Sequence, residues 1–191
     1  MAKSRKRIKN LRFTVSSLLS LWLLSACTGL PEGIKAVDNF DINRFQGKWY
    51  EIARLDHSFE RGLEQVSANY SLRDDGGIRV INRGFNVQKQ QWKEAEGRAY
   101  AIADENIGHL KVSFFGPFYS SYVVFELAQQ SNTSAGPDYA FVTSYSKDYL
   151  WLLSRTPTIS PKLKAHFLAQ VEALGFAKEN LIWVNQHSDI K

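Results

Sequence analysis

Alternation of apolar and polar residues dominates the chain after residue 46. Short runs rich in Val, Ile, Tyr, Phe and Trp recur about every ten residues with turn-forming residues between them, a spacing typical of antiparallel sandwiches and barrels. The pattern predicts eight strands, approximately at 47–55, 65–73, 77–86, 91–103, 109–115, 120–128, 139–145 and 148–155.

The second and third predicted strands form the clearest hairpin. Residues 74–77 read Asp-Asp-Gly-Gly, and glycine supplies the positive φ that a tight turn requires. Along the two arms, alternation places Tyr70 on the same face as Ala68, and Asn82 on the same face as Val80.

One helix is predicted after the strands. Ser160 is its N-cap, Pro161 its first residue and Gly175 its stop. Its apolar stripe consists of Leu163, Phe167, Leu168, Val171 and Leu174. The run 149–153 is apolar on both faces, so one face can meet a core while the other meets this helix, and residues 181–184 form a last short strand.

Three short motifs resemble the signatures of the lipocalin family. Gly47-Lys48-Trp49-Tyr50 resembles the Gly-x-Trp motif of the first strand, Pro137-Asp138-Tyr139 the second signature, and Arg155 the third. From Asn39 to about Gln186 the chain is similar to the bacterial branch of the family. The resemblance implies an all-β fold, an eight-stranded antiparallel up-and-down β-barrel with one C-terminal α-helix packed outside.

The resemblance also assigns roles to the signature residues. It implies a barrel that is closed near Gly47 by a short helical turn, open at the other end, and able to hold a small apolar ligand. Trp49 would lie across the closed end, and Arg155 would pack over its indole while bonding to backbone carbonyls. Strand count alone does not decide between a filled interior and a cavity.

The alternation of inward and outward positions along the strands points to five candidate ligand-binding residues. Tyr149 and Trp151 share parity with Arg155, which predicts that they line the cavity towards its mouth. Tyr70 and Asn82 point inward and could orient a polar head group; Tyr122 is a weaker candidate, because its run is apolar on both faces. The alternatives are core aromatics without a ligand, and polar side chains that bond to each other or to water.

The N-terminus has the pattern of a cleaved export signal. A basic run precedes an apolar stretch from Phe13 to Leu24, too short for a permanent membrane span. Leu24-Ser25-Ala26-Cys27 resembles the lipobox of bacterial lipoproteins, which implies a signal peptide at 1–26, an acylated Cys27, a tether over 27–39 and a barrel domain over 40–191. An ordinary secretory signal with an incidental cysteine is the alternative. Thr28, which is not aspartate, favours the outer membrane, with the domain facing the periplasm.

Charge and residue spacing exclude several functional classes. The sequence pI is about 9.3, but residues 1–26 carry six of the 24 basic residues and none of the 19 acidic ones, so the mature chain is slightly acidic and nucleic-acid binding is not expected. The four histidines show no metal-ligand spacing. With Cys27 committed to lipid, no thiol nucleophile remains, and no phosphate loop or nucleophile elbow is present. We expect no metal, no cofactor and no enzyme activity.

These observations predict a membrane-anchored carrier of a fatty acid such as palmitate, or of a lysophospholipid, for storage, scavenging or transport. A lipid-modifying enzyme on the same scaffold and an interaction module with a packed barrel remain alternatives. His57, Phe59 and Glu60 lie in the loop after the first strand, at the expected mouth, as candidate gating residues. The aromatics of Phe114–Tyr119 are a candidate homodimer contact.

Overall fold

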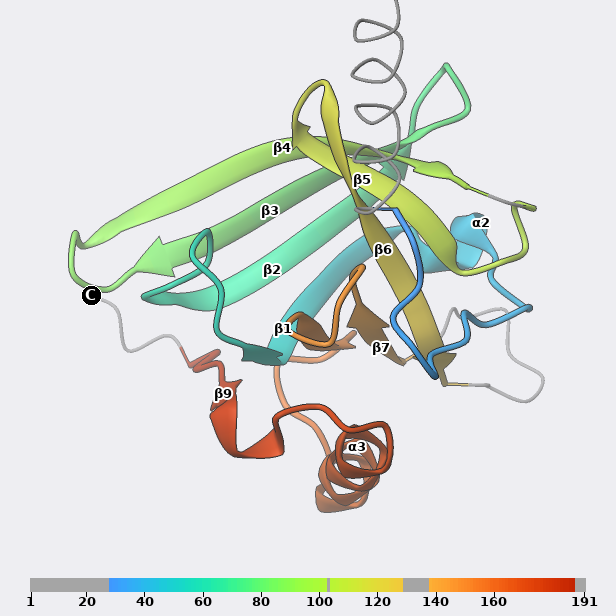
Figure 1. The fold of residues 1–191 in the computed structure, drawn as a ribbon. Coiled ribbons are helices and arrows are strands. Elements are labelled where there is room, and N and C mark those ends of the chain that lie inside the picture. Colours follow the sequence, from blue (N-terminus) through green and yellow to red (C-terminus); the bar gives the residue numbers. More distant parts are fainter. Residues whose placement is uncertain (1–27, 103, 129–137, 188–191) are drawn as a thin grey trace, which may run out of the picture.

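Antiparallel strands in the computed structural model form one sheet that closes on itself (Figure 1). The structure describes residues 28–102, 104–128 and 138–187. The strands are β1 (Gly47–Leu55), β2 (Leu63–Leu72), β3 (Ile78–Asn86), β4 (Gln91–Ala101), β5 (His109–Phe115), β6 (Phe118–Leu127), β7 (Tyr139–Thr143), β8 (Leu150–Ser154) and β9 (Leu181–Trp183). The helices are α2 (Ile42–Phe45) and α3 (Pro161–Ala173), with a 3-10 turn at Lys178–Asn180.

The strand order confirms the predicted barrel. Strands β2 to β8 follow one another, β1 follows β8, and a further β1–β2 pairing closes the ring. Several predicted strand ends were wrong by a few residues. For example, β7 ends at Thr143 because its Oγ1 donates to the Tyr149 carbonyl over 2.7 Å, which turns the chain before β8.

Strand β1 changes partner along its length. Its first half pairs with β2, from Gly47 opposite Tyr70 to Tyr50 opposite Ser67. Its last residues, Ala53 to Leu55, pair instead with β9. The Gln186 side chain fills the resulting gap, since its amide donates to the carbonyls of Glu51 and Val66 over 2.7 and 2.8 Å. The final strand therefore completes the wall of the barrel at its open end.

Trp49 closes the other end. It is fully buried, its Nε1 donates to the Phe45 carbonyl over 2.8 Å, and its ring packs on that of Phe45 on α2. The Arg155 guanidinium lies 3.9 Å from the indole centroid and donates to the carbonyls of Lys48 and Arg44. Gly47 has φ of +89°, a conformation that favours glycine, and Arg155 Nη1 lies 3.5 Å from the position of an added Cβ.

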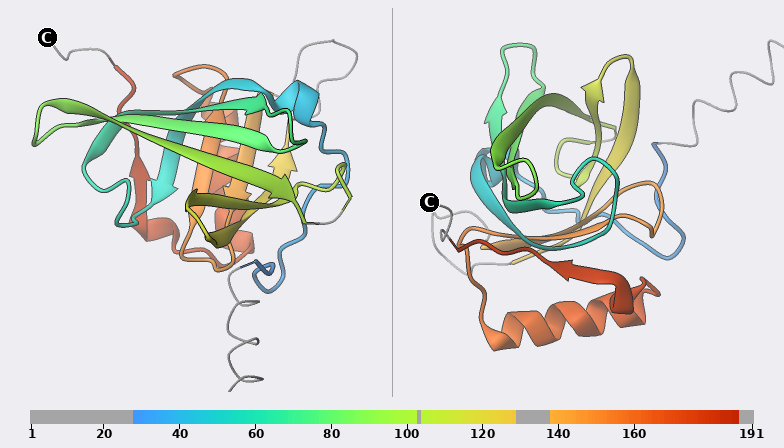
Figure 2. Two further views of the ribbon diagram at one scale, coloured as in Figure 1. Left: turned by 90° about the horizontal axis from the view of Figure 1, so that it is seen from above. Right: turned by 90° about the vertical axis from the view of Figure 1, so that its left-hand side faces the viewer.

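Helix α3 packs outside the barrel, as predicted (Figure 2). The Ser160 hydroxyl accepts from the Leu163 amide, and Gly175 takes a positive φ just beyond the helix. Phe167 and Val171 are fully buried against the outward residues of β8, including Leu150 and Leu152. The inward residue Leu153 belongs to the separate core inside the barrel. The run 149–153 therefore packs into both cores, one on each face of the sheet.

The segment expected to be a tether packs against the barrel in its described part, residues 28–39. Val37 exchanges backbone hydrogen bonds with Val124 and Gly108 over 2.9 and 2.8 Å, and the Ser121 hydroxyl donates to the Gly29 carbonyl over 2.7 Å. Ile34 is buried in the outer core. Glycine and proline suggested a flexible linker, but the segment has backbone partners and an apolar contact along β6. Cys27 and the preceding signal segment lie outside the described residues.

Replacing the closed-end residues should destabilise the fold and leave ligand affinity in the remaining folded protein unchanged. Trp49→Ala removes a fully buried side chain, for which the typical cost is about 3–5 kcal/mol, and Arg155→Ala leaves two carbonyl acceptors without their donor. Thermal melts, with lipid titrations below the melting range, check this. An unchanged melting temperature with abolished binding would assign these residues to the ligand site instead.

Candidate functional site

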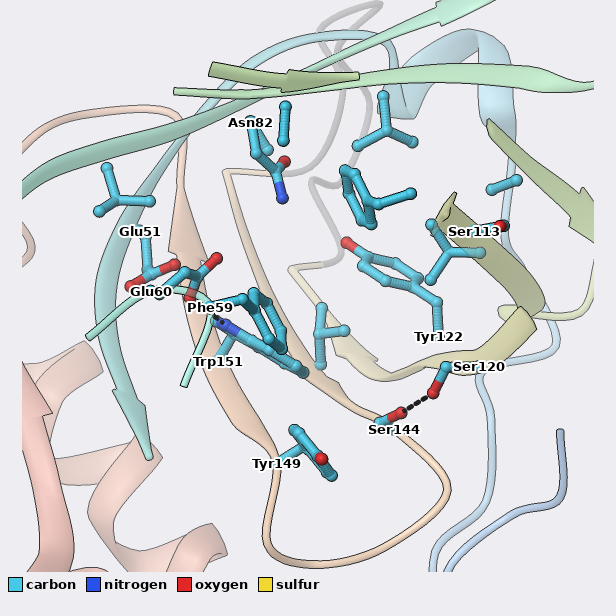
Figure 3. Close-up of a pocket in the computed structure, with 18 of the residues that line it drawn as sticks. Glu51, Phe59, Glu60, Asn82, Ser113, Ser120, Tyr122, Ser144, Tyr149 and Trp151 are labelled. Atoms are coloured by element: carbon cyan, nitrogen blue, oxygen red, sulfur yellow. Dashed lines mark hydrogen bonds between the residues drawn. The ribbon is translucent and has the colours of Figure 1, made fainter. Parts of the chain in front are cut away.

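A cavity of about 520 Å³ occupies the barrel between the Trp49 closure and the mouth (Figure 3). Residues from all eight barrel strands, β1 to β8, line the cavity, so the ring of strands encloses it. The apolar lining includes Val66, Ala68, Val80, Ala99, Leu110, Val112, Val142 and Leu153. The barrel is therefore a cup that is closed at the Trp49 end, and residues of its inner core also form much of the cavity wall.

Two tyrosines meet at the deep end of the cup. The hydroxyls of Tyr70 and Tyr122 lie 2.8 Å apart, and the Tyr70 ring contacts Phe45 edge-on. Burial raises the pKa of both phenols, so both remain neutral. The sequence left open that Tyr70 bonds to Asn82 or to water, but its partner in the structure is Tyr122. The Tyr122 side chain faces the inside of the barrel, which settles the question of its face that the sequence pattern left open.

Unpaired polar atoms line the middle of the cup. Oδ1 of Asn82 and Oγ of Ser113 are both buried without a hydrogen-bond partner among the described residues. Asn82 stands opposite Ala68 on β2 and Ala95 on β4, which leaves space beside it. A buried polar atom without a partner is costly, so a bound polar group here would satisfy hydrogen-bonding capacity that the folded chain leaves open.

The two aromatics predicted at the start of the eighth strand, Tyr149 just before β8 and Trp151 within it, lie towards the mouth. The rings of Trp151 and Tyr149 are nearly parallel, with centroids 6.1 Å apart, and both line the cavity. Trp151 Nε1 donates to Glu60 Oε2 over 3.1 Å. The structure thus brings Tyr70, Asn82, Tyr122, Tyr149 and Trp151 into one cavity, and their role in binding a ligand stays a prediction.

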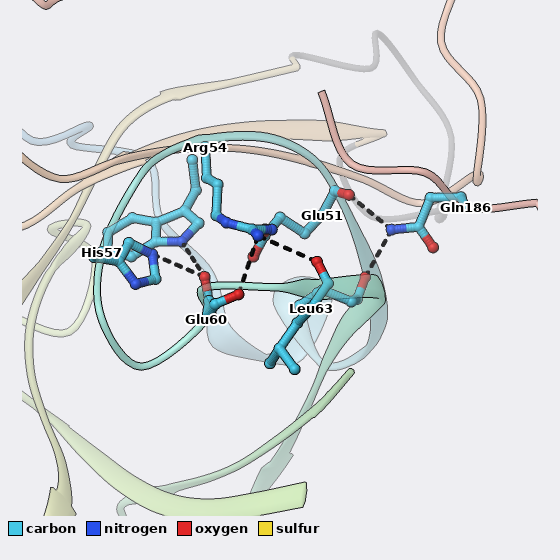
Figure 4. A network of polar contacts seen from close by, with 8 residues as sticks. Glu51, Arg54, His57, Glu60, Leu63 and Gln186 are labelled. Atoms are coloured by element: carbon cyan, nitrogen blue, oxygen red, sulfur yellow. Dashed lines mark hydrogen bonds and ion pairs between the residues drawn. The ribbon is translucent and has the colours of Figure 1, made fainter. Parts of the chain in front are cut away.

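Four buried charged or titratable side chains hold the loop at the mouth (Figure 4). Arg54 Nη1 donates to Glu51 Oε1 over 2.6 Å, and Nη2 donates to the carbonyls of Glu60 and Leu63. His57 Nε2 lies 2.8 Å from Glu60 Oε2. These contacts tie the loop 56–62 to β1 and, through Trp151, to β8. We call Glu51, Arg54, His57 and Glu60 the mouth network.

The two carboxyls of the mouth network are electrostatically different. Burial, reinforced by the neighbouring Glu60, raises the pKa of Glu51 well above its usual value despite Arg54. Burial also opposes ionisation of Glu60, but its contacts with His57 and Trp151 outweigh burial and lower its pKa. Glu51 therefore keeps its proton to higher pH, and Glu60 carries the negative charge, which faces His57 and Trp151.

The mouth network also positions aromatic side chains at the opening. The His57 ring stacks on Phe59 with centroids 4.0 Å apart and contacts Trp151 at 5.2 Å. Phe59 is half exposed and lines the cavity. The loop that the sequence placed at the mouth therefore forms part of the rim, and its gating role stays a prediction.

Sequence reasoning missed Glu51 and Arg54 as site residues. One signal was present, because Glu51 has the same parity as Trp49 on β1 and so had to point inward. Arg54 carried no such signal, since a register shift between Glu51 and Ala53 breaks the alternation of β1. Ser113 was missed for a similar reason, because the β5–β6 register shifts between Val112 and Phe115.

Among the described residues, no group of three or more His, Cys, Asp and Glu side chains is placed to hold a metal ion. Within the same part of the chain, no helix is long and apolar enough to cross a bilayer.

Comparison with known sequences gives a family match over the whole barrel. Residues 40–186 match the model of the lipocalin-like domain. A protein of Vibrio cholerae named outer membrane lipoprotein Blc is 53% identical over 164 residues, which are 86% of this chain and 93% of that protein. The Escherichia coli K12 protein of the same name is 47% identical over 174 residues, 90% of this chain and 95% of its own.

Solved structures add a match of fold. The cockroach allergen Per a 4 superposes with a TM-score of 0.63 at 17% sequence identity and covers 84% of this chain and 96% of its own. At this identity the likeness concerns the barrel architecture alone.

Neutralising Glu51 should remove a pH dependence of stability. Because the pKa of Glu51 is raised in the folded state, its contribution is complete below the ordinary glutamate pKa and is lost as pH rises through the raised value. The melting temperature of the native chain should therefore fall as pH rises above the ordinary glutamate pKa and level off above the raised pKa of Glu51. Glu51→Gln should flatten this fall, because its amide mimics the protonated carboxyl.

Glu94→Gln on the exposed part of β4 is the matched control and should keep the native slope. Melting curves followed by circular dichroism provide the measurement. If Glu51→Gln and the native chain lost stability in parallel over this range, Glu51 would not be the titrating group.

Proposed function

The chain belongs to the lipocalin family, and from this premise we propose that its barrel binds one single-chain amphipathic lipid. The ligand class is a fatty acid such as palmitate or a lysophospholipid, carried for storage, scavenging or transport in the cell envelope. The observation that carries the proposal is the largely apolar cup of about 520 Å³ with a polar, aromatic mouth.

Cavity size and shape support a single chain. The volume falls within the range of about 300–1,000 Å³ typical of small-molecule sites. The cup is walled by strands on all sides and closed below by Trp49, so a ligand must enter end-on. Two acyl chains side by side need twice the cross-section of one. A single chain fits this geometry better.

The distribution of polar groups supports one orientation. At the deep end, the hydroxyls of Tyr70 and Tyr122 are hydrogen-bonded to each other. Asn82 and Ser113 offer open hydrogen-bonding capacity at mid-depth, and Lys93, Tyr149 and Glu60 line the mouth. The tail would therefore point towards Trp49 and the head group towards the mouth.

Binding without covalent chemistry is the proposal that the site supports best. A packed scaffold is disfavoured by the open cup. The enzyme alternative would need an accessible nucleophile, and His109 Nε2 does lie 3.3 Å from Ser121 Oγ. The Ser121 hydroxyl, however, donates to the Gly29 carbonyl and is buried beneath the N-terminal segment.

We also propose that the protein is an outer-membrane lipoprotein facing the periplasm. The relatives from Vibrio cholerae and Escherichia coli carry the name outer membrane lipoprotein, and this chain spans more than nine tenths of each. The sequence supplies a lipobox that ends at Cys27. Two or more acyl chains at this position would anchor the domain stably.

Affinity should rise with chain length until the cup is full and then level off. Each buried methylene contributes about 0.8 kcal/mol, at most about a fourfold gain in affinity. Fatty acids and lysophospholipids of increasing length are titrated into a domain beginning at Thr28 while tryptophan fluorescence is followed. Indifference to length, or preference for two-chain phospholipids, would rule out the single-chain proposal.

Two variants identify the source of the signal. Trp183 lies outside the barrel against Phe167 of α3, so Trp183→Phe should keep the fluorescence change. Trp151→Phe should lose it, because Trp151 lines the cavity.

Cys27→Ser should leave an unprocessed precursor that incorporates no labelled palmitate in growing cells. The reason is that acylation of the thiol precedes cleavage in lipoproteins of this type. Gel mobility, label incorporation and membrane fractionation check the result. Normal maturation and outer-membrane fractionation of the serine variant would refute the anchor.

A further inference from the structure

The turn between β5 and β6 exposes two phenylalanines to solvent. Phe115 and Phe118 pair across this turn, and their side chains are 79% and 74% exposed, the highest values among the large apolar residues that the structure describes. Residues 115–118, which we call the hairpin tip, project from one side of the barrel, while α3 covers the opposite side (Figure 2). Exposed aromatics at a projecting turn mark a contact surface.

Cations and a tyrosine stand directly behind the hairpin tip. The Arg98 guanidinium lies 6.0 Å from the Tyr119 ring centroid, and Lys111 Nζ lies 5.4 Å from it. Arg98 also reaches the turn, because its Nη2 lies 3.0 Å from where a Cβ on Gly116 would stand. Apolar rings in front, with a tyrosine and two cations behind, match the layers of a membrane interface from acyl chains to phosphates.

The path of the N-terminal segment brings the proposed anchor to the same place. The segment runs along β6, with Gly29 bonded to Ser121 and Val37 bonded to Val124, and the Thr28 backbone lies against His109 at the start of β5. Ser121 is three residues from Phe118, about 10 Å along a strand. Position 27 is two residues from Gly29, at most about 7 Å away. Acyl chains attached there would enter a bilayer close to the tip.

The hairpin tip also borders the ligand cavity. Phe115, Phe118 and Tyr119 line its opening together with Lys93 and Ala95 of β4. A lipid that leaves a membrane beside the tip would therefore reach the cup without crossing open water.

We propose that the hairpin tip is a second membrane contact of the anchored protein. Phe115 and Phe118 enter the apolar layer of the leaflet that holds the acyl chains, and Arg98 and Lys111 lie at the level of its phosphates. The proposal rests on the proposed acylation of Cys27 for the position of the bilayer. It adds an orientation, in which the barrel lies with its β5–β6 side on the membrane and α3 faces away.

A second copy of the chain, the homodimer partner considered from the sequence, fits this surface less well. Two phenylalanines offer about 300–500 Å², whereas a stable interface needs about 800 Å² from each partner. A two-fold contact centred on the tip would also bring the Arg98 and Lys111 of both copies together. Phospholipid phosphates complement these charges.

The test uses the full chain, processed in cells and reconstituted into phosphatidylethanolamine–phosphatidylglycerol vesicles. Cys27 is the only cysteine, so its acylation leaves an introduced cysteine as the one reactive thiol. Phe118→Cys, and separately Phe115→Cys, receives an environment-sensitive fluorophore. Ala169→Cys on the exposed face of α3 is the matched control. Vesicle flotation reports the anchor independently of the label.

We expect a blue-shifted label at both tip positions, with loss of quenching by aqueous iodide and quenching by spin-labelled lipids. The label on α3 should show the opposite behaviour. If the protein floats with the vesicles while iodide still quenches both tip labels, the proposed membrane contact is wrong and the anchor assignment is unaffected. A second copy of the chain would instead give protection from iodide without quenching by spin-labelled lipids. That protection would disappear when the protein is diluted with more lipid. Failure to float would refute the anchor, and with it the proposed orientation.

Discussion

The packing of Trp49 against Phe45 and Arg155 is the interaction on which the rest of the barrel depends. It places a fully buried indole, an aromatic ring and a cation at one end of the ring of strands. The Arg155 guanidinium joins the start of β1 to α2 through the carbonyls of Lys48 and Arg44. Because this end is filled and cross-linked, the strands above it can surround empty space.

Polar contacts hold the mouth at the open half of the barrel. The mouth network and the bridging amide of Gln186 connect β1, β2, β8 and the loop 56–62. Buried charges of this kind need partners, and here Arg54 contacts the Glu51 carboxyl and two backbone carbonyls, while His57 and Trp151 contact the ionised Glu60. The arrangement keeps the mouth ordered while leaving the apolar interior free for a ligand.

Local patterns in the sequence were enough to predict the elements and the inward faces. Alternation placed Tyr149 and Trp151 on the cavity side of β8, and the Ser160 cap with Gly175 bounded α3. Contacts between distant segments were not predictable in this way. Residues 28–39 were assigned to a tether because they contain Gly29, Pro31 and Gly33 and lack a hydrophobic period. Their packing could not be foreseen, since Gly29 bonds to Ser121 on β6, about ninety residues later. The register shift in β1 similarly concealed Arg54.

The central claim is that the cup carries one single-chain lipid in the cell. Native mass spectrometry of the protein purified from its own membrane, in a mild detergent, tests it most directly. The account predicts a population heavier than the acylated chain by the mass of one fatty acid or one lysophospholipid, which is lost on organic extraction. A spectrum that shows only the ligand-free chain, or a bound two-chain phospholipid, would contradict it.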